Sequence, residues 1–382
     1  MKKRLWLLAF LGALTASGCG WLAPEEPVQR VSPLEPIDNP LRGELVWSRK
    51  LGKDTAGEGV VLRLAVDGGR VFAAQVSGRV TAMDAGSGNL AWEVDTASDL
   101  GGGVGAGEGL VLVGTREGEV IALQQSGGAE MWRARVNAEI LSAPAVTQGV
   151  VAVHTNDGRV VGLDAGSGAE IWSFRRSVPI LSLRGNSAPV AAGTDFICGL
   201  DGGKLVNLDS ATGRPRWESS IAYPSGRTEL ERVVDLDADP LVAGDNVFVT
   251  TYQGQMAVVQ LSTGQTGWSR SFSAYNQLGA SPNALLATDE VGHLWAIEPP
   301  TGETLWTQEA LSGRRLSAPV GVGNRVAVGD LEGYLHWLDA DSGAIIGRTR
   351  IASSPIQAPP VARGDRVFVL GEEGELAAVR AP

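Results

Sequence analysis

Cysteine and histidine are scarce in this chain, with two cysteines and three histidines among 382 residues. Cys19 lies in the N-terminal leader, which leaves Cys198 without a partner for an intramolecular disulfide. Cys198 lies in an apolar, strand-like run, and this predicts a buried, unreactive thiol. His154, His293 and His336 are scattered and lack the spacing of metal ligands. The composition therefore argues against a disulfide framework, a thiol-based active site and a histidine metal centre.

Basic residues are also few, because 32 Lys and Arg stand against 43 Asp and Glu, for a net charge of -11. Nucleic-acid binding needs a basic stripe, and none occurs, so nucleic acid is not an expected partner. A hydrophobic fraction of 43% is that of a globular protein. Aromatic residues make up only 6%, yet 11 of them are tryptophan, and glycine reaches 51. Tryptophan and glycine are therefore the residues whose positions repay study.

The N-terminus reads as a targeting segment. Met1–Arg4 is a positive stretch, Leu5–Leu14 is a short apolar run, and Ala16-Ser-Gly-Cys19 resembles a bacterial lipobox. We therefore expect a signal peptide over residues 1–18 and lipidation of Cys19; an ordinary secretory signal is the alternative. Gly20 stands where an Asp would retain such a lipoprotein in the inner membrane, so we expect an anchor in the outer membrane, facing the periplasm. No later apolar run is long enough to span a membrane.

Residues 19–42 are rich in proline and have no apolar period, which predicts a tether. In an extended, polyproline-like state such a segment reaches roughly 70 Å, at about 3.1 Å per residue. From residue 43 onward a repeat takes over, and we expect one domain over residues 43–382.

The repeat is a Gly-x-x-x-Trp element that returns along the chain, and in seven units another glycine lies 14 residues before the position that ends the element. Such constant spacing predicts a hairpin of fixed strand length and turn type. The positions that end the element are Trp47, Trp92, Trp132, Trp172, Trp217, Trp268, Trp306 and, without its tryptophan, Gly347.

Each unit holds four short Val/Ile/Leu-rich runs in about 40 residues, which leaves no room for a crossover helix. Four such strands form an antiparallel meander, the blade of a β-propeller. The last unit has three strands, while Arg42–Trp47 is a strand with no unit before it. We therefore predict an all-β, eight-bladed propeller in which the N-terminal strand completes the last blade, leaving no open sheet edge at the join.

The turn element Asp164-Ala-Gly-Ser-Gly-Ala-Glu-Ile-Trp172 resembles the tryptophan-docking motif of quinoprotein-type propellers. Its Asp and Ser satisfy turn amides, its glycine takes a positive φ, and its indole packs between blades. One copy per blade predicts architecture, not a unique site. Quinoprotein dehydrogenases, which depend on pyrroloquinoline quinone, are the enzyme alternative. They need carboxylates and amides around Ca²⁺ and the quinone, and no such set is evident here. We expect no catalytic residue, cofactor or metal.

Two connections between blades are longer than the repeat requires. Trp172 to Trp217 spans 45 residues and Trp217 to Trp268 spans 51, against 40 in the two preceding units. The second contains a capping box at Thr228, which predicts one helical turn. Both connections join an outer strand to the next inner strand and should lie side by side on one face. Apolar residues beside an Arg and carboxylates are typical of a protein interface. The candidate residues are Leu181, Leu183, Arg184, Asp235 and Asp237.

An alternative for these residues is internal: Leu181 and Leu183 pack within their own loop, and Arg184 pairs with Asp235 or Asp237. Lipobox, proline-rich tether, eight docking blades and both connections together resemble the BamB family, lipoprotein subunits of the outer-membrane β-barrel assembly machinery. The resemblance covers the whole chain. It implies a non-enzymatic, monomeric scaffold that uses these residues to bind BamA at its periplasmic POTRA domains and aids insertion of β-barrel proteins. Unfolded outer-membrane proteins are a further expected partner, through pairing with blade edges.

Four positions depart from the docking motif, and the blades that contain them are expected to be less regular. They are Gln124, Gln260 and Glu298 in place of the turn Asp, and Gly347 in place of Trp.

Overall fold

The computed structural model describes residues 30–53, 55–57, 60–176, 187–223, 234–251, 254–274 and 276–382. The chain divides into two units, Met1–Arg30 and Val31–Pro382, and the description below concerns the second. Within the described ranges, no helix is long and apolar enough to cross a membrane.

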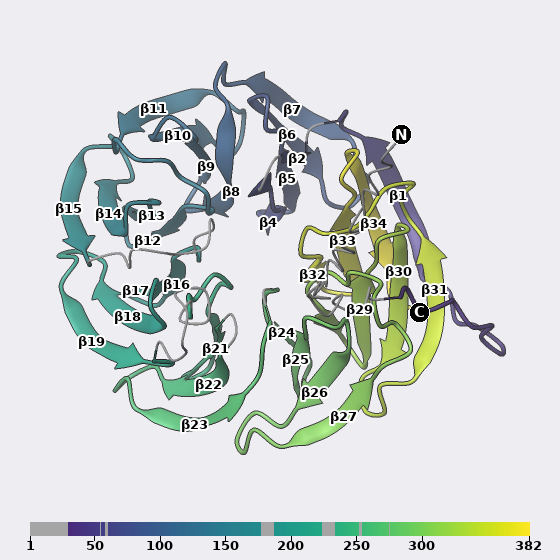
Figure 1. The fold of residues 1–382 in the computed structure, drawn as a ribbon. Coiled ribbons are helices and arrows are strands. Elements are labelled where there is room, and N and C mark those ends of the chain that lie inside the picture. Colours follow the sequence, from purple (N-terminus) through teal and green to yellow (C-terminus); the bar gives the residue numbers. More distant parts are fainter. Residues whose placement is uncertain are drawn as a thin grey trace, which may run out of the picture. The chain divides into compact units, whose positions relative to one another are not determined.

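Eight four-stranded antiparallel sheets follow one another around a ring (Figure 1). The first four blades are β4–β7 (Ala65–Asp67, Arg70–Ala74, Arg79–Asp84, Leu90–Asp95), β8–β11 (Leu100–Gly107, Leu110–Thr115, Glu119–Gln124, Glu130–Arg135), β12–β15 (Ala145–Thr147, Val150–His154, Arg159–Asp164, Glu170–Arg175) and β16–β19 (Val190–Ala192, Asp195–Leu200, Lys204–Asp209, Pro215–Ser220).

The next three blades repeat this order, and the eighth takes its outer strand from the N-terminus. They are β20–β23 (Leu241–Ala243, Asn246–Thr250, Gln255–Gln260, Thr266–Ser271), β24–β27 (Gly279–Ala280, Leu285–Thr288, Leu294–Ile297, Thr304–Gln308), β28–β31 (Val320–Val322, Arg325–Gly329, Tyr334–Asp339, Ile345–Arg350) and β32–β34 (Val361–Arg363, Arg366–Leu370, Glu375–Arg380) with β1 (Glu44–Lys50). In the register of the last sheet, Glu44 lies opposite Arg380 and Lys50 opposite Glu375.

The eight-bladed propeller and its closure by the N-terminal strand are thus confirmed (Figure 1). One element lies outside the eight blades, a small hairpin of β2 (Ala56–Gly57) and β3 (Val60–Val61) in the connection from blade 8 to blade 1. The middle strands are almost wholly buried; all six residues of β9 are, for instance. Both faces of such a strand pack against neighbouring blades, which is why these runs are continuously apolar and not alternating. Outer strands such as β15 alternate instead, because one face meets solvent.

The docking motif forms the joint between blades. In blade 3, Asp164 Oδ1 accepts hydrogen bonds from Ser167 N at 2.8 Å and from Ser167 Oγ at 2.6 Å. These bonds hold the pKa of Asp164 below its ordinary value. Trp132 of the preceding blade packs on Gly168 and donates from Nε1 to the Ala165 carbonyl at 2.8 Å. The same indole-to-carbonyl bond is made by all seven tryptophans of the repeat, at 2.7–3.1 Å.

The docking turns at Gln124, Gln260 and Glu298 keep the main-chain form of the Asp turns but differ in their side-chain hydrogen bonds. Gln260 and Glu298 accept from the Thr three residues later, at 2.7 and 2.5 Å, as the shorter Asp does elsewhere. The turns at Gln124, Gln260 and Glu298 also keep the main-chain bond from the following glycine, at 2.8–2.9 Å. Among the described residues, the Gln260 and Glu298 side chains accept only the hydroxyl bond, whereas Asp164 also accepts from Ser167 N. Gly127, three residues after Gln124, carries no hydroxyl.

Blade 7 does depart from the pattern, as predicted. Gly347 on β31 lies opposite Trp337 on β30, whereas the other blades place the tryptophan on the outer strand. Trp337 is fully buried, so the large and small residues have exchanged strands. A side chain at position 347 would meet the Leu41 carbonyl at 1.7 Å, and Leu41 N donates to the Ile346 carbonyl at 2.8 Å. The chain leading into β1 therefore occupies the space of the missing indole, and Gly43 packs on Trp337.

Candidate partner-binding face

The connections between blades begin and end on one face of the ring. Four antiparallel strands return the chain to the face it started from, so each outer strand ends where the next inner strand begins. The turns between the second and third strands share this face, which we call the connection face. Val136 N, after β11, donates to the Gly118 carbonyl of such a turn at 2.8 Å. The docking turns lie on the opposite face.

Asp239 is the polar centre of the connection face. Its Oδ1 accepts from Ala188 N at 2.7 Å, and its Oδ2 contacts Arg63 Nη1 and Gln277 Nε2. These residues precede the inner strands of blades 5, 4, 1 and 6 respectively. Both members of the Arg63–Asp239 ion pair are mostly buried, with side-chain exposures of 24% and 16%. One carboxylate thus joins connections from four blades.

The predicted carboxylates lie in the same connection as Asp239. Asp235 is 1% exposed and accepts from Gly202 N at 2.9 Å. Asp237 is half-buried, and burial, with Asp235 and Asp201 nearby, raises its pKa to about 7. Burial and Asp235 likewise raise the pKa of Asp201 to about 6. Carboxylates that are crowded at low exposure resist simultaneous ionisation, which is why the pKa values of Asp201 and Asp237 are both raised.

The first connection is described only at its end. Leu181, Leu183 and Arg184 lie outside the described residues, as does the helical turn predicted at Thr228. The Ala188–Asp239 hydrogen bond joins the ends of the two long connections, next to the inner strands of blades 4 and 5. A partner role for the five candidate residues, and their internal pairing, stay predictions.

The sequence-based reasoning missed a third long connection, residues 51–64, which carries β2, β3 and Arg63. Its signal was available: Trp47 to Trp92 spans 45 residues, as many as Trp172 to Trp217. Arg63, Asp239 and Gln277 have no sequence signature, since they meet only when the ring closes.

The side chains at the centre of the face do not fit a quinone and Ca²⁺ site. The Asp239 carboxylate at this centre is already engaged by an arginine, a glutamine and a main-chain amide. Among the described residues, no group of three or more His, Cys, Asp or Glu side chains could hold a metal ion. Cys198 is buried, and burial raises its thiol pKa, as expected of an unreactive cysteine.

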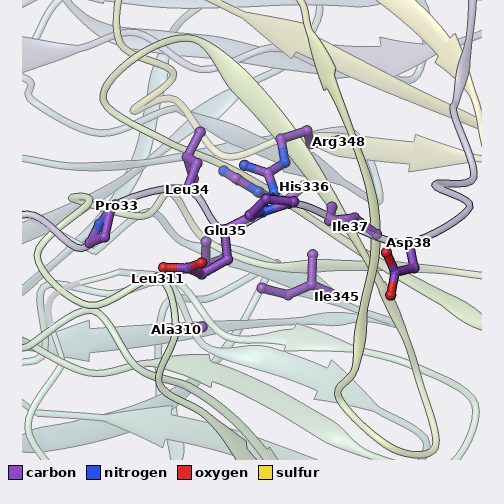
Figure 2. Close-up of a pocket in the computed structure, with 11 residues that line it drawn as sticks. Pro33, Leu34, Glu35, Ile37, Asp38, Ala310, Leu311, His336, Ile345 and Arg348 are labelled. Carbon is purple, nitrogen blue, oxygen red and sulfur yellow. Dashed lines mark hydrogen bonds between the residues drawn. The ribbon is translucent and has the colours of Figure 1, made fainter.

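A buried ionic group fixes the segment before β1 to blade 7. Arg314 Nε donates to Asp330 Oδ2 at 2.8 Å, and Arg314 Nη1 donates to the Ser32 carbonyl at 3.0 Å. His336 Nε2 lies 2.8 Å from the same Asp330 oxygen. A cavity of about 290 Å³ lies between residues 33–38 and this blade, with His336 at its wall (Figure 2). Part of the predicted tether thus contacts the propeller.

Comparison with known proteins settles the family. The model of the family described as outer membrane protein assembly factor BamB matches residues 36–99, 76–308 and 290–381. A relative of that name from Alkalilimnicola ehrlichii is 48% identical over 99% of this chain and 97% of its own. Relatives of that name from Pseudomonas aeruginosa and Escherichia coli are 46% and 33% identical, covering 98% and 97% of this chain and 98% and 97% of their own. The chain belongs to the BamB family.

Solved structures agree with membership of the BamB family. The crystal structure of BamB from Moraxella catarrhalis matches with a TM-score of 0.81 and 28% identity, over 89% of this chain and all of that chain. A quinohemoprotein alcohol dehydrogenase from Comamonas testosteroni matches at 0.71, with 15% identity, over 88% of this chain and 76% of that one. At 15% identity, the similarity to the alcohol dehydrogenase shows that this BamB-family chain shares its propeller fold.

Proposed function

We propose that this chain is a non-enzymatic scaffold of outer-membrane protein assembly that binds BamA through its connection face. The relatives' name, outer membrane protein assembly factor, supports the broad role. The observation that carries the proposal is the meeting of two long connections at Asp239. A propeller needs neither insertion to close its ring, so their length and their convergence call for another explanation.

The proposed contact divides its tasks among five residues. Leu181 and Leu183 are the apolar anchors, and Arg184 supplies directed hydrogen bonds, the combination that dominates binding energy in many interfaces. Asp237, half-buried, is a carboxylate that a partner can reach. Asp235 is buried, and its bond from Gly202 N holds the second long connection against the β17–β18 turn. The POTRA domains of BamA are the proposed surface on the other side.

Co-purification with BamA tests the proposal. Leu181→Ala combined with Arg184→Ala is expected to abolish it while leaving the thermal melt unchanged. Leu90→Ala is the matched control, because Leu90 is a 60% exposed leucine on the outer strand β7, away from the connection face. Loss of binding in the control, or retained binding in the double variant, contradicts the proposed interface.

The anchor is proposed at Cys19, which places the chain on the periplasmic face of the outer membrane. Cys19→Ser is expected to abolish labelling with radioactive palmitate and to release the protein from the membrane fraction. Continued sedimentation with outer membranes would point to another attachment.

Strand capture is a second candidate function. The fourth strand of each blade is an edge of its described sheet, and three successive edges expose a large apolar side chain: Leu90 at 60%, Met131 at 51% and Ile171 at 47%. Unpaired edge groups with apolar neighbours suit an extended client strand. Photo-crosslinkers at these three positions are expected to capture unfolded outer-membrane proteins, and crosslinks to BamA alone would rule the idea out.

The enzyme alternative makes a separate prediction. A quinoprotein would show a higher melting temperature with pyrroloquinoline quinone and Ca²⁺, and would reduce an acceptor dye. Since the central carboxylate is already engaged, we expect neither effect.

A further inference from the structure

The connection from blade 8 to blade 1, residues 51–64, is built as a separate structure on the connection face. It contains the hairpin β2–β3, which pairs with none of the eight blades. Thr55 Oγ1 donates to the carbonyls of Gly371 and Glu372 at 3.1 and 2.9 Å, on the blade 8 side. Gln75 Nε2 donates to the Lys53 carbonyl at 2.7 Å, on the blade 1 side. Thr55 and Lys53 are thus anchored, one toward blade 8 and the other toward blade 1.

Arg63, at the end of this connection, reaches across the ring. Blades 1 and 5 stand opposite each other in an eight-bladed ring, yet Arg63 before blade 1 pairs with Asp239 before blade 5. The two residues are 176 positions apart in the chain. Figure 1 shows the inner strands β4, β16 and β24 around the centre of the ring, and Arg63 and Asp239 shortly precede the inner strands β4 and β20. Connection 51–64 therefore meets the other two long connections at the centre of the face.

We propose that connection 51–64 is a third part of the partner-binding face, held against the other two by the Arg63–Asp239 pair. The inference rests on the proposed function and extends it to residues of the first blade. Three insertions into an otherwise regular repeat converge on one carboxylate, and each is longer than closure of the ring needs. A partner seated over Asp237 therefore also covers residues across the centre of the face.

The pair contributes to binding by pre-organisation. Asp239 holds Ala188, two residues after the segment that carries Leu181 and Arg184, and Arg63 holds Asp239. If the pair is broken, the connections must be ordered when the partner binds, and this cost lowers affinity. Arg63 and Asp239 act here as positioning residues: their effect is on the arrangement of the binding loops.

Contact is tested by a photo-crosslinking amino acid at Lys53, whose side chain is 74% exposed. The probe is the purified periplasmic domain of BamA, mixed with the full-length chain. Ser126 is the control position, because it is exposed in a docking turn on the opposite face. A crosslink from position 53 and none from 126 supports the inference. Equal crosslinking at both positions, or none at 53, overturns it.

Positioning is tested by affinity. Arg63→Gln and Asp239→Asn are each expected to raise the dissociation constant for the BamA domain by about tenfold, because each removes one charge-assisted hydrogen bond. The double variant should be no weaker than either single variant, because both break the same pair. Arg63→Lys keeps the charge and is expected to recover much of the affinity. The melting temperatures of these variants should lie within about 2 °C of each other. Unchanged affinity in Arg63→Gln overturns the inference.

The outcomes distinguish a failure of the proposed function from a failure of the inference on connection 51–64. If the wild-type chain does not bind the BamA domain, the proposed function fails. If the wild-type chain binds, and Leu181→Ala with Arg184→Ala abolishes binding, the proposed function holds. Wild-type affinity in Arg63→Gln and no crosslink from Lys53 then overturn the third connection alone.

Discussion

Two glycines of blade 3 offer a direct measure of what a docking joint contributes to stability. Gly149 and Gly168 have almost the same left-handed backbone, with φ of 73° and 74°. A Cβ on Gly149 would meet nothing within 4 Å, whereas a Cβ on Gly168 would lie 2.6 Å from Trp132 Cε3. Alanine at the two positions therefore carries a similar backbone penalty and differs mainly in its contact with the indole, with Ala134 Cβ a further neighbour of position 168 at 3.3 Å.

The magnitudes follow from these distances. An alanine in the left-handed region costs about 1 kcal/mol, and this is the whole expected effect of Gly149→Ala. Carbon atoms prefer about 3.5–4.0 Å, so Gly168→Ala forces Trp132 to move by about 1 Å in a packed joint. Overpacking of this kind costs about 1–3 kcal/mol more. Unfolding of the unit Val31–Pro382 has an entropy of about 0.7 kcal/mol per kelvin, from its length.

Thermal melts at one scan rate are the assay. We expect a fall of about 1–2 °C for Gly149→Ala and about 3–6 °C for Gly168→Ala. In a Trp132→Ala background the clash with the indole is gone and the nearest remaining contact is Ala134 Cβ at 3.3 Å, so Gly168→Ala should then cost little more than Gly149→Ala. Equal losses for the two glycines in the wild-type background, or an undiminished loss without Trp132, would refute the view that the indole sets the joint.

Three further predictions concern buried charge and the irregular blade. Because the pKa of Asp237 is raised, the folded chain binds a proton at this carboxylate more tightly than the unfolded chain does. The carboxylate therefore favours folding at low pH, and this contribution is lost as the pH rises from about 4 to about 7. Asp237→Asn should flatten that part of a profile of melting temperature against pH. Asp330→Ala leaves Arg314 buried without its main partner and should lower the free energy of unfolding by about 3 kcal/mol in urea titration. Gly347→Trp restores the repeat motif yet should lower the melting temperature, because the Leu41 main chain fills that space; a stabilised variant would contradict the exchange of residues in blade 7.

Much of the fold could be predicted because the repeat is local. The turn motif of each unit lies within nine consecutive residues, as in Asp164 to Trp172, and similar hydrogen bonds form in successive blades. The missing tryptophan at Gly347 could be read from the sequence, but the residues that fill its space could not. Trp337 and Leu41 supply the volume from a neighbouring strand and from the segment before β1, and no local pattern announces such an exchange.

The candidate face was predictable only in part. Length alone marked the connections of Asp235 and Asp237, because insertions into a regular repeat are countable. The same count applied to Trp47–Trp92 would have marked residues 51–64. Burial of Asp235 on Gly202 N was not predictable, since a carboxylate in a polar loop reads as exposed until its neighbours are known.

By itself the sequence determined the blade count, the closing strand and the tryptophan joints, because hairpin length, turn chemistry and indole size act over a few residues or between adjacent units. Only the tertiary structure decided what lies at the centre of the connection face. Arg63, Ala188, Asp239 and Gln277 belong to four blades and come within hydrogen-bond reach when the ring closes. A pairing across 176 residues depends on the summed geometry of the intervening blades, and that sum is a property of the closed ring.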